Sequence, residues 1–178
     1  MSDGPVPEAL SLAHTRAAFD ESFAMSARGR DRRESAILVR VGSHVFCIRS
    51  RHICGLAKGR RIVPLPSRIP ELLGLIALRG SLVPVYDLAA LLAVTPGASH
   101  PWVALVPGET PLGLAFDEFE GQLEAEWLAD GQTASPREHF RPLARMGSAV
   151  RAVLDIPGLA QAIRKRAGIA DPAKERKP

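Results

Sequence analysis

Histidines, cysteines and aspartates are the side chains of this sequence that could do chemistry, and their spacing forms no catalytic set. The five histidines are scattered, mostly beside expected turns, and no two have the spacing of metal ligands. They are His14, His44, His52, His100 and His139. The sequence also contains no glycine-rich phosphate loop, no HExxH zinc motif and no GxSxG nucleophile motif. We therefore expect no catalytic residues, no metal site and no cofactor.

Two pairs of residues come closest to a reactive arrangement. Cys54 lies two residues after His52, so the two share a face on a strand, but nothing supplies an orienting acid or an oxyanion hole. Asp87 and Asp117 each follow an expected strand and could form an acid–base pair. A helix cap at Asp87 and a strand end at Asp117 explain the same residues without catalysis. Cys47 and Cys54 belong to no CxxC motif, which indicates reduced core or strand cysteines.

A basic stretch at residues 49–68 raises nucleic acid as an alternative partner. Its six basic residues, with no acid among them, are Arg49, Arg51, Lys58, Arg60, Arg61 and Arg68. A small β-barrel that binds single-stranded nucleic acid also presents aromatic side chains for base stacking, and this stretch has none. A charged solvent-exposed edge or a protein interface fits the stretch better. A single-strand nucleic-acid-binding barrel stays open as the alternative function.

The acidic residues gather in a different part of the chain. Between Trp102 and Asp130 there is no lysine or arginine. The acids there are Glu109, Asp117, Glu118, Glu120, Glu124, Glu126 and Asp130. An ordinary mixed surface accounts for this separation, and so does head-to-tail self-association that joins a basic end to an acidic end.

The expected elements that position these residues are short strands separated by glycine- and proline-rich turns, a pattern typical of a β-barrel or sandwich. We expect strands at 36–41, 45–48, 82–86, 102–106, 112–117, 119–128 and 151–154. Residues 71–76 fit a strand or a helical turn. Asp87 is placed to cap a short helix at 88–92, and Asp155 and Pro157 open a last helix that ends at Gly168.

The domain organisation follows from changes in composition. The chain has 178 residues, 46% of them hydrophobic, which is enough for one domain or two small subdomains sharing a core. Residues 1–35 are expected to form an N-terminal arm, with a helix near 8–24 and a basic linker, and residues 169–178 a disordered tail. The start of the chain lacks the pattern of a secretory signal, and no stretch has the roughly 20 apolar residues of a membrane span. We expect a cytoplasmic protein without membrane insertion.

The segment PELLGLIALRGSLVPVYDLAALL at residues 70–92 carries a resemblance to a known family. It resembles the CheW family of chemosensory coupling proteins, whose pattern runs through a glycine-led apolar strand, Leu-Arg-Gly, Val-Pro-Val and Asp-Leu. Supporting matches lie at Gly42, at residues 113–117 (GLAFD) and at residues 153–155 (VLD). Within the family pattern the chain differs at Ala77, Leu73 and Gly55, which indicates a dedicated pathway with its own receptor and kinase.

This resemblance implies both a fold and a set of contacts. The fold would be mainly β, with two SH3-like five-stranded β-barrel subdomains sharing a core, a C-terminal helix and the helical N-terminal arm, in a CheW-like domain at 36–168. The function would be that of a non-catalytic adaptor between the tip of a methyl-accepting chemoreceptor and the regulatory domain of a CheA-type histidine kinase. Carried over by position, Arg79 and Ile53 would lie in the receptor groove, and Leu73 and Gly74 at the kinase contact. A small-ligand sensor that uses the cleft between subdomains is a third hypothesis.

Overall fold

The computed structural model describes residues 33–127, 140–146 and 148–168. The expected helix near 8–24, the loop at 129–139 and the tail at 169–178 lie outside these residues. Of the expected basic linker, only residues 33–35 are described, and they begin the first strand. The described residues from Glu34 onward belong to one compact unit.

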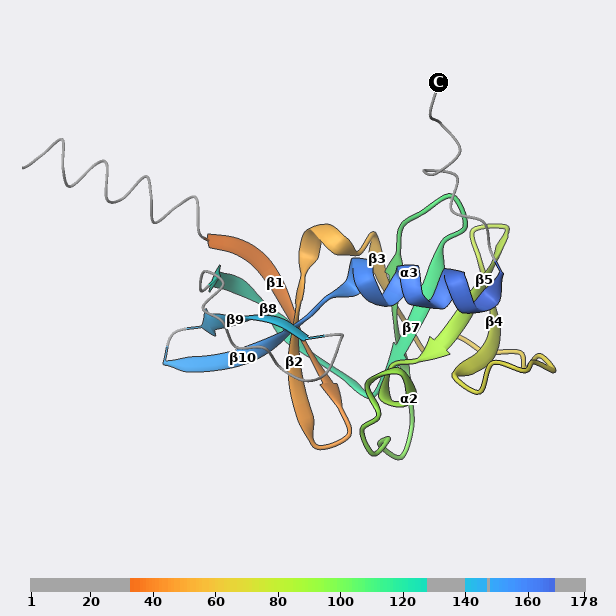
Figure 1. Cartoon of the computed structure of the whole chain (residues 1–178), viewed down its shortest axis with the longest axis horizontal. Coiled ribbons are helices and arrows are strands. Elements are labelled where there is room, and N and C mark those ends of the chain that lie inside the picture. The colour runs from red at the N-terminus through yellow and green to blue at the C-terminus, as the bar shows by residue number, and fades with distance from the viewer. Residues whose placement is uncertain (1–32, 128–139, 147, 169–178) are drawn as a thin grey trace, which may run out of the picture. The chain divides into compact units, whose positions relative to one another are not determined.

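The chain builds two five-stranded sheets (Figure 1). The first is a closed barrel in the order β1 (Arg33–Val41), β2 (His44–Arg49), β10 (Ala149–Leu154), β9 (Phe140–Met146) and β8 (Glu118–Trp127). The second has the order β3 (Gly55–Lys58), β6 (Trp102–Val106), β7 (Leu112–Phe116), β5 (Ser81–Asp87) and β4 (Leu72–Leu78). Three helical segments complete the described fold, namely η1 (Ser50–His52), α2 (Leu88–Leu92) and α3 (Ile156–Ala167).

The mainly β class with two five-stranded units is confirmed, and the chain returns at its end to the unit in which it began. One unit closes by strand pairing. In the other, β3 and β4 stand at the two ends of the strand order, and the segment between them joins β4 through a single bridge of Val63 to Leu75. In sequence, the second sheet is therefore one continuous insertion, residues 55–116, between the barrel strands β1 and β2 and the barrel strands β8 to β10.

Most expected elements are confirmed in type and position, and two strands were missed, β3 and β9. Residues 72–78 form a strand rather than a helical turn. Asp87 caps α2 by accepting a hydrogen bond from Ala89 N at 2.8 Å, and Asp155 caps α3 by accepting one from Gly158 N at 3.3 Å. β3 is only four residues long, with the sequence GLAK, and β9 has the sequence FRPLARM, which contains a proline and two arginines and no apolar alternation.

Buried hydrophobic residues form three clusters: one inside the barrel, one inside the second sheet and one between the two units. The barrel strands β1 and β2 are buried on both faces and contribute to two of these clusters. The barrel interior holds small side chains and one large one, in the set Ala36, Cys47, Ala125, Trp127, Ala144 and Val153. The interior of the second sheet contains Ile76, Val83, Val85 and Val103. The largest cluster lies between the two units, and we call it the shared core.

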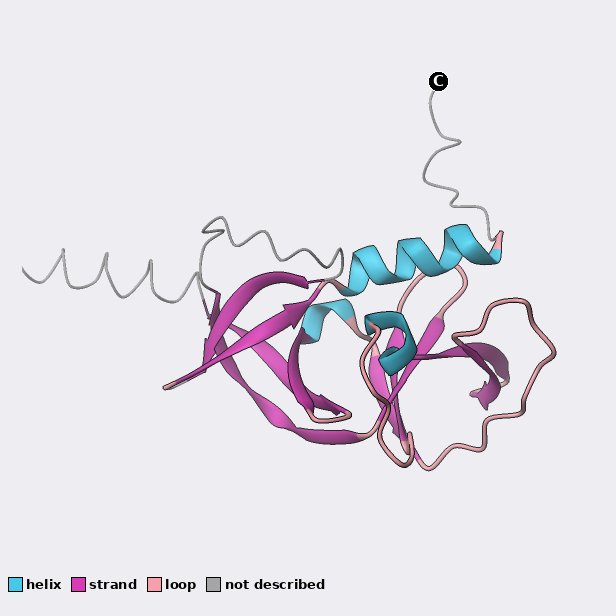
Figure 2. Ribbon diagram, turned by 60° about the horizontal axis from the view of Figure 1, so that its bottom comes forward, coloured by secondary structure: helices cyan, strands magenta, loops and turns pink. Residues whose placement is uncertain are grey.

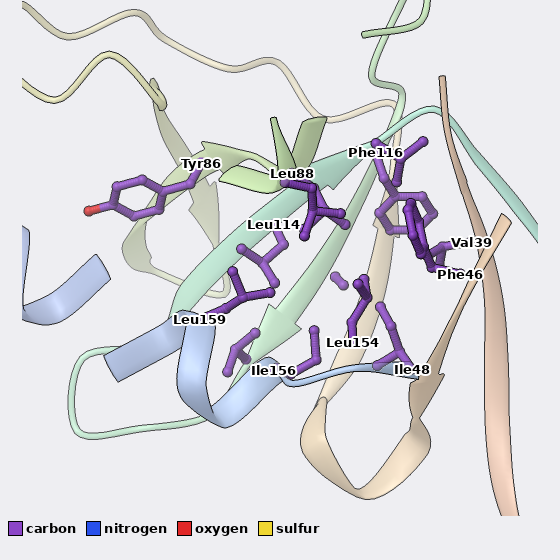
Figure 3. Packing of buried hydrophobic residues seen from close by; sticks show 14 of the residues in the cluster. Val39, Phe46, Ile48, Tyr86, Leu88, Leu114, Phe116, Leu154, Ile156 and Leu159 are labelled. Atoms are coloured by element: carbon purple, nitrogen blue, oxygen red, sulfur yellow. The ribbon is translucent and has the colours of Figure 1, made fainter. Parts of the chain in front are cut away.

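The shared core joins the outward faces of β1, β2 and β10 to the second sheet and to both α-helices. Figure 3 shows Val39, Phe46 and Ile48 of the barrel facing Leu114 and Phe116 of β7. The view also shows Leu159 of α3 beside Leu114 of β7, and Leu154 of β10 beside Ile48. Each such side chain contributes about 1.5–3 kcal/mol when fully buried, so this cluster is the main stabilising contact between the units. The sharing of a core is confirmed.

The β1–β2 turn is held under the loop that follows α2. Gly42 has φ of 58°, and a Cβ at this position would collide with the backbone oxygen of Thr95. Gly80 also has a positive φ, 83°, but a Cβ there would meet no atom within 4 Å. The two glycines therefore share a left-handed backbone and differ in the space around it.

Replacing Gly42 with Ala should lower the free energy of unfolding more than replacing Gly80 with Ala. Both variants carry the left-handed strain of about 1–2 kcal/mol. Only Gly42→Ala adds a steric clash with Thr95, at a cost of about 1–3 kcal/mol. Urea denaturation followed by circular dichroism measures both values. Equal destabilisation by the two substitutions would show that the Thr95 contact does not constrain the turn.

Candidate functional site

The two cysteines are placed differently, and neither has a catalytic partner among the described residues. Cys47 lies inside the barrel, where burial raises the pKa of its thiol to about 11. At neutral pH this side chain is therefore a thiol and a poor nucleophile. Cys54 is exposed, and its Sγ lies 3.5 Å from the carbonyl oxygen of Leu105. The neighbouring His52 instead accepts a hydrogen bond at its Nε2 from Arg51 Nε, at 3.4 Å.

Asp87 and Asp117 come together in the structure, with His100 between them. His100 Nδ1 lies 2.8 Å from Asp117 Oδ1, and its Nε2 lies 3.8 Å from Asp87 Oδ2. The second oxygen of Asp117 accepts a hydrogen bond from Gly42 N at 2.5 Å. Together with the cap at Ala89, these bonds tie the β1–β2 turn, the start of α2 and the end of β7 to one another. The cluster is a structural junction, and sequence reasoning missed its third member, His100.

The basic stretch is partly neutralised within the chain. Arg49 and Arg51 pair with Glu34 at 3.3 and 3.1 Å, and the Arg49 guanidinium lies 4.1 Å from the centre of the Trp127 ring. Lys58 Nζ lies 5.0 Å from the Trp102 ring centre. The aromatic rings near these cations are thus covered by the cations themselves rather than open for base stacking. This arrangement does not favour the nucleic-acid alternative.

Arg79 occupies the tip of the β4–β5 hairpin. Leu78 pairs with Ser81, which leaves Arg79 and Gly80 as a two-residue turn. Both have positive φ, 48° and 83°, as a type I′ turn requires. The Arg79 side chain is exposed to solvent.

Ile53 and Arg79 precede two different strands at the same end of the second sheet, β3 and β5. Ile53 follows η1, is half-buried and packs against the shared core. β3 and β5 run in the same direction, because β3 is antiparallel to β6, β6 is antiparallel to β7, and β7 is parallel to β5. The residues that precede β3 and β5 therefore lie at one end of the sheet, with β6 and β7 between those strands.

Leu73 and Gly74 form a β-bulge where β4 begins to pair with β5. Leu72 pairs with Tyr86 and Gly74 with Val85, so Leu73 is the extra residue. Gly74 is buried with φ of 144°, and a Cβ there would collide with the backbone of Val63. Leu73 is half-buried against the interior of the second sheet. The structure thus brings these two residues together, with Gly74 beneath the connecting segment.

An exposed apolar surface lies on the outer side of the same hairpin, and sequence reasoning did not identify it. Val63 is opposite Leu75, and Ala77 is opposite Leu82, so these four side chains share one face. Leu82 is 68% exposed and Val63 is 54% exposed. The alternation of β4 predicts which residues face outward, but the pairing of Val63 with Leu75 depends on the tertiary fold. We call these four residues the hairpin face.

Comparison with known proteins identifies the family. A family model described as the CheW-like domain matches residues 35–164, which is most of the chain. The chain belongs to the CheW-like family.

A solved structure supports the same assignment for the fold. The scaffolding protein TtCheW from Thermoanaerobacter tengcongensis is similar with a TM-score of 0.57 and 14% identity, over 68% of this chain and 88% of that chain. Among curated proteins, no significant match was found. Membership of the CheW-like family supports a role in chemotaxis signal transduction as a coupling adaptor.

The CheW-like match covers both sheets and most of α3, so the hairpin and the shared core are parts of one family domain. Among the described residues, no helix of this CheW-like chain has the length and apolarity that a bilayer crossing needs. Within that same part of the chain, no group of three or more histidines, cysteines and acids could hold a metal ion.

Proposed function

We propose that this chain is a non-catalytic cytoplasmic adaptor that couples a methyl-accepting chemoreceptor to a CheA-type histidine kinase. The CheW-like match over residues 35–164 carries the proposal, and the β architecture supports it. An adaptor of this kind needs two separate docking surfaces and no reactive group. The second sheet offers two candidates that adjoin at the tip of the β4–β5 hairpin, namely the hairpin face with the Leu73 bulge and the sheet end with Ile53 and Arg79.

The kinase regulatory domain is proposed to dock at the hairpin face and the neighbouring bulge of Leu73 and Gly74. β4 is an edge strand, so no further strand of the sheet pairs along its outer edge. Solvent-exposed leucine and valine side chains on one face of a sheet are a typical centre of a protein interface. Gly74 would act indirectly, because it holds the Val63 segment against β4 and so builds the face.

Replacing Leu82 with Ser should weaken binding of the kinase regulatory domain about tenfold. Leu82 is exposed in the free protein, so its loss removes apolar contact without opening a cavity. A tenfold change corresponds to about 1.4 kcal/mol, as expected for one apolar contact at an interface. Val150→Ser is the matched control, since Val150 is 42% exposed on β10 of the barrel. Isothermal titration calorimetry with the isolated regulatory domain measures both, and equal affinities for the two variants would place the kinase elsewhere.

The receptor tip is proposed to dock at the sheet end that holds Ile53 and Arg79. Ile53 supplies a half-buried apolar contact, and Arg79 supplies an exposed guanidinium on a rigid turn. An amphipathic helical tip needs both kinds of contact. Arginine is suited to this position because its planar group can pair with carboxylates in two directions.

Replacing Arg79 with Asn should weaken receptor binding several-fold and leave the fold intact. Asn tolerates the left-handed backbone of the turn better than Ala does, so this substitution removes the charge with little added strain. Arg151→Asn, at an exposed arginine of β10, is the control for a loss of charge elsewhere. A pull-down with a receptor cytoplasmic fragment measures the effect. Unchanged capture by the Arg79 variant would remove this residue from the receptor contact.

Head-to-tail self-association is a further proposal and rests on charges on different units. Arg60, Arg61 and Arg68 are exposed on the segment between β3 and β4. Of the glutamates on β8, Glu118 and Glu120 pair with Arg40 of β1, whereas Glu124 is exposed. Because the basic segment belongs to the second sheet and β8 to the barrel, one copy could present its basic segment to the acidic strand of the next.

Self-association of this kind should be strong at low salt and weak at high salt. Screening by added ions shortens the range of attraction between exposed charges to about 3 Å at 1 M salt. Sedimentation velocity at low and high ionic strength measures the change. The double variant Arg60→Gln and Arg61→Gln should abolish association, whereas Lys165→Gln on α3 should not. Association indifferent to salt, or its absence at low salt, would contradict the proposal.

A further inference from the structure

A pocket outside both proposed docking surfaces lies where the barrel, the second sheet and α3 meet. Its volume is about 370 Å³, within the range of small-molecule sites. Its lining comes from η1, from the end of β6 with the β6–β7 connection, and from residues 156–164 of α3. Figures 1 and 2 both show η1 beside the start of α3. Three segments far apart in sequence therefore build one cavity.

The floor of this pocket is apolar and buried. Val106 at the end of β6 is 4% exposed, and Ile156 and Ala160 on α3 are 0% and 2% exposed. Pro107 and Pro157 add apolar surface at the rim. A ligand would therefore have to place a hydrocarbon or aromatic body against this floor.

The polar groups around the floor are hydrogen-bond donors, and none of the lining residues is an acid. Arg51, Arg164 and Gln161 lie at the rim. Arg164 Nη2 donates to the carbonyl oxygen of Pro107 at 3.2 Å, which fixes the guanidinium above the β6–β7 connection. Arg51 Nε lies 3.1 Å from Glu34 Oε1, and the Arg51 side chain is 60% exposed. Two acids outside the lining lie close enough to raise the pKa of His52, namely Glu34, which also engages Arg49, and Asp155, which precedes Ile156.

His52 belongs to the lining but is turned away from a ligand. Its Nε2 lies 3.4 Å from Arg51 Nε, which is also 3.1 Å from Glu34 Oε1. Nδ1 is buried and has no hydrogen-bond partner in the described part of the chain. Burial, with the charges of Arg51 and Arg49, lowers the pKa of His52, so the ring is neutral near pH 7.

We propose that this pocket binds a small organic carboxylate, an anion with one acid group on an apolar body. The acid group accepts hydrogen bonds from Arg164 and Arg51, and the body lies against Val106, Ile156 and Ala160. Two arginines on a rim without acids favour an anion over a neutral ligand. The apolar floor favours a carboxylate with a hydrocarbon or aromatic body over inorganic phosphate, which would leave the floor uncovered.

The test is a titration of the ¹⁵N-labelled full chain, followed by two-dimensional NMR, with phenylacetate and octanoate as probes. Saturable shifts are expected at η1, at residues 106–111 and at residues 156–164 of α3. Phenylacetamide has the same body without the charge, and inorganic phosphate has charge without the body. Both should bind at least tenfold more weakly than phenylacetate.

Two variants separate the pocket from the rest of the basic surface. Arg164→Gln should weaken phenylacetate binding at least fivefold, whereas Lys165→Gln, one residue further along α3 and outside the lining, should not change it. An unperturbed spectrum of each free variant shows that the fold is intact. The proposal is overturned by equal binding of phenylacetate and phenylacetamide, by equal losses in both variants, or by no saturable binding of either carboxylate at millimolar concentration. Because none of these measurements involves a kinase or receptor, they are independent of the proposed adaptor function.

Discussion

The packing between the barrel and the second sheet is the interaction on which the rest of the structure depends. β1 and β2 are covered on one side by the barrel interior and on the other by the shared core, so both of their faces must be apolar. A five-stranded barrel is narrow, and small residues such as Ala36, Ala125 and Ala144 fill most of its interior. The larger side chains, including Phe46, Ile48 and Phe116, are left for the layer between the units.

The polar junction at Asp117 complements this apolar layer at the point where the chain crosses between units. Asp117 ends the second sheet, and the next residue begins β8 of the barrel. Its carboxylate contacts the β1–β2 turn through Gly42 and the loop between α2 and β6 through His100. Both oxygens therefore have a partner, so a carboxylate that could have acted as a base instead fixes the crossing.

The hairpin face lies outside the shared core, whereas the pocket has the core residues Val106, Ile156 and Ala160 as its floor. The hairpin face is on the outer side of β4 and β5, while Val83 and Val85 of the same strand pair point into the sheet interior. Side chains on such a face can change without opening a cavity in the core. A fold of this kind suits an adaptor, because partner recognition and folding stability depend on different side chains of the same strands.

Sequence by itself determined the β class, most of the strands, both helix caps and the CheW-like resemblance. These features depend on local patterns, such as apolar runs between turn residues, an aspartate before a helix, and the short motif from Gly74 to Leu88. The strand β9 could not be predicted, because its pairing with β8 and β10 rather than its own alternation makes it a strand. The role of His100, the hairpin face and the pocket beside α3 were decided only by the tertiary structure. In each case residues far apart in sequence meet, as Val63 meets Leu75 and His52 lines a pocket with Arg164, and such contacts depend on how the two sheets pack.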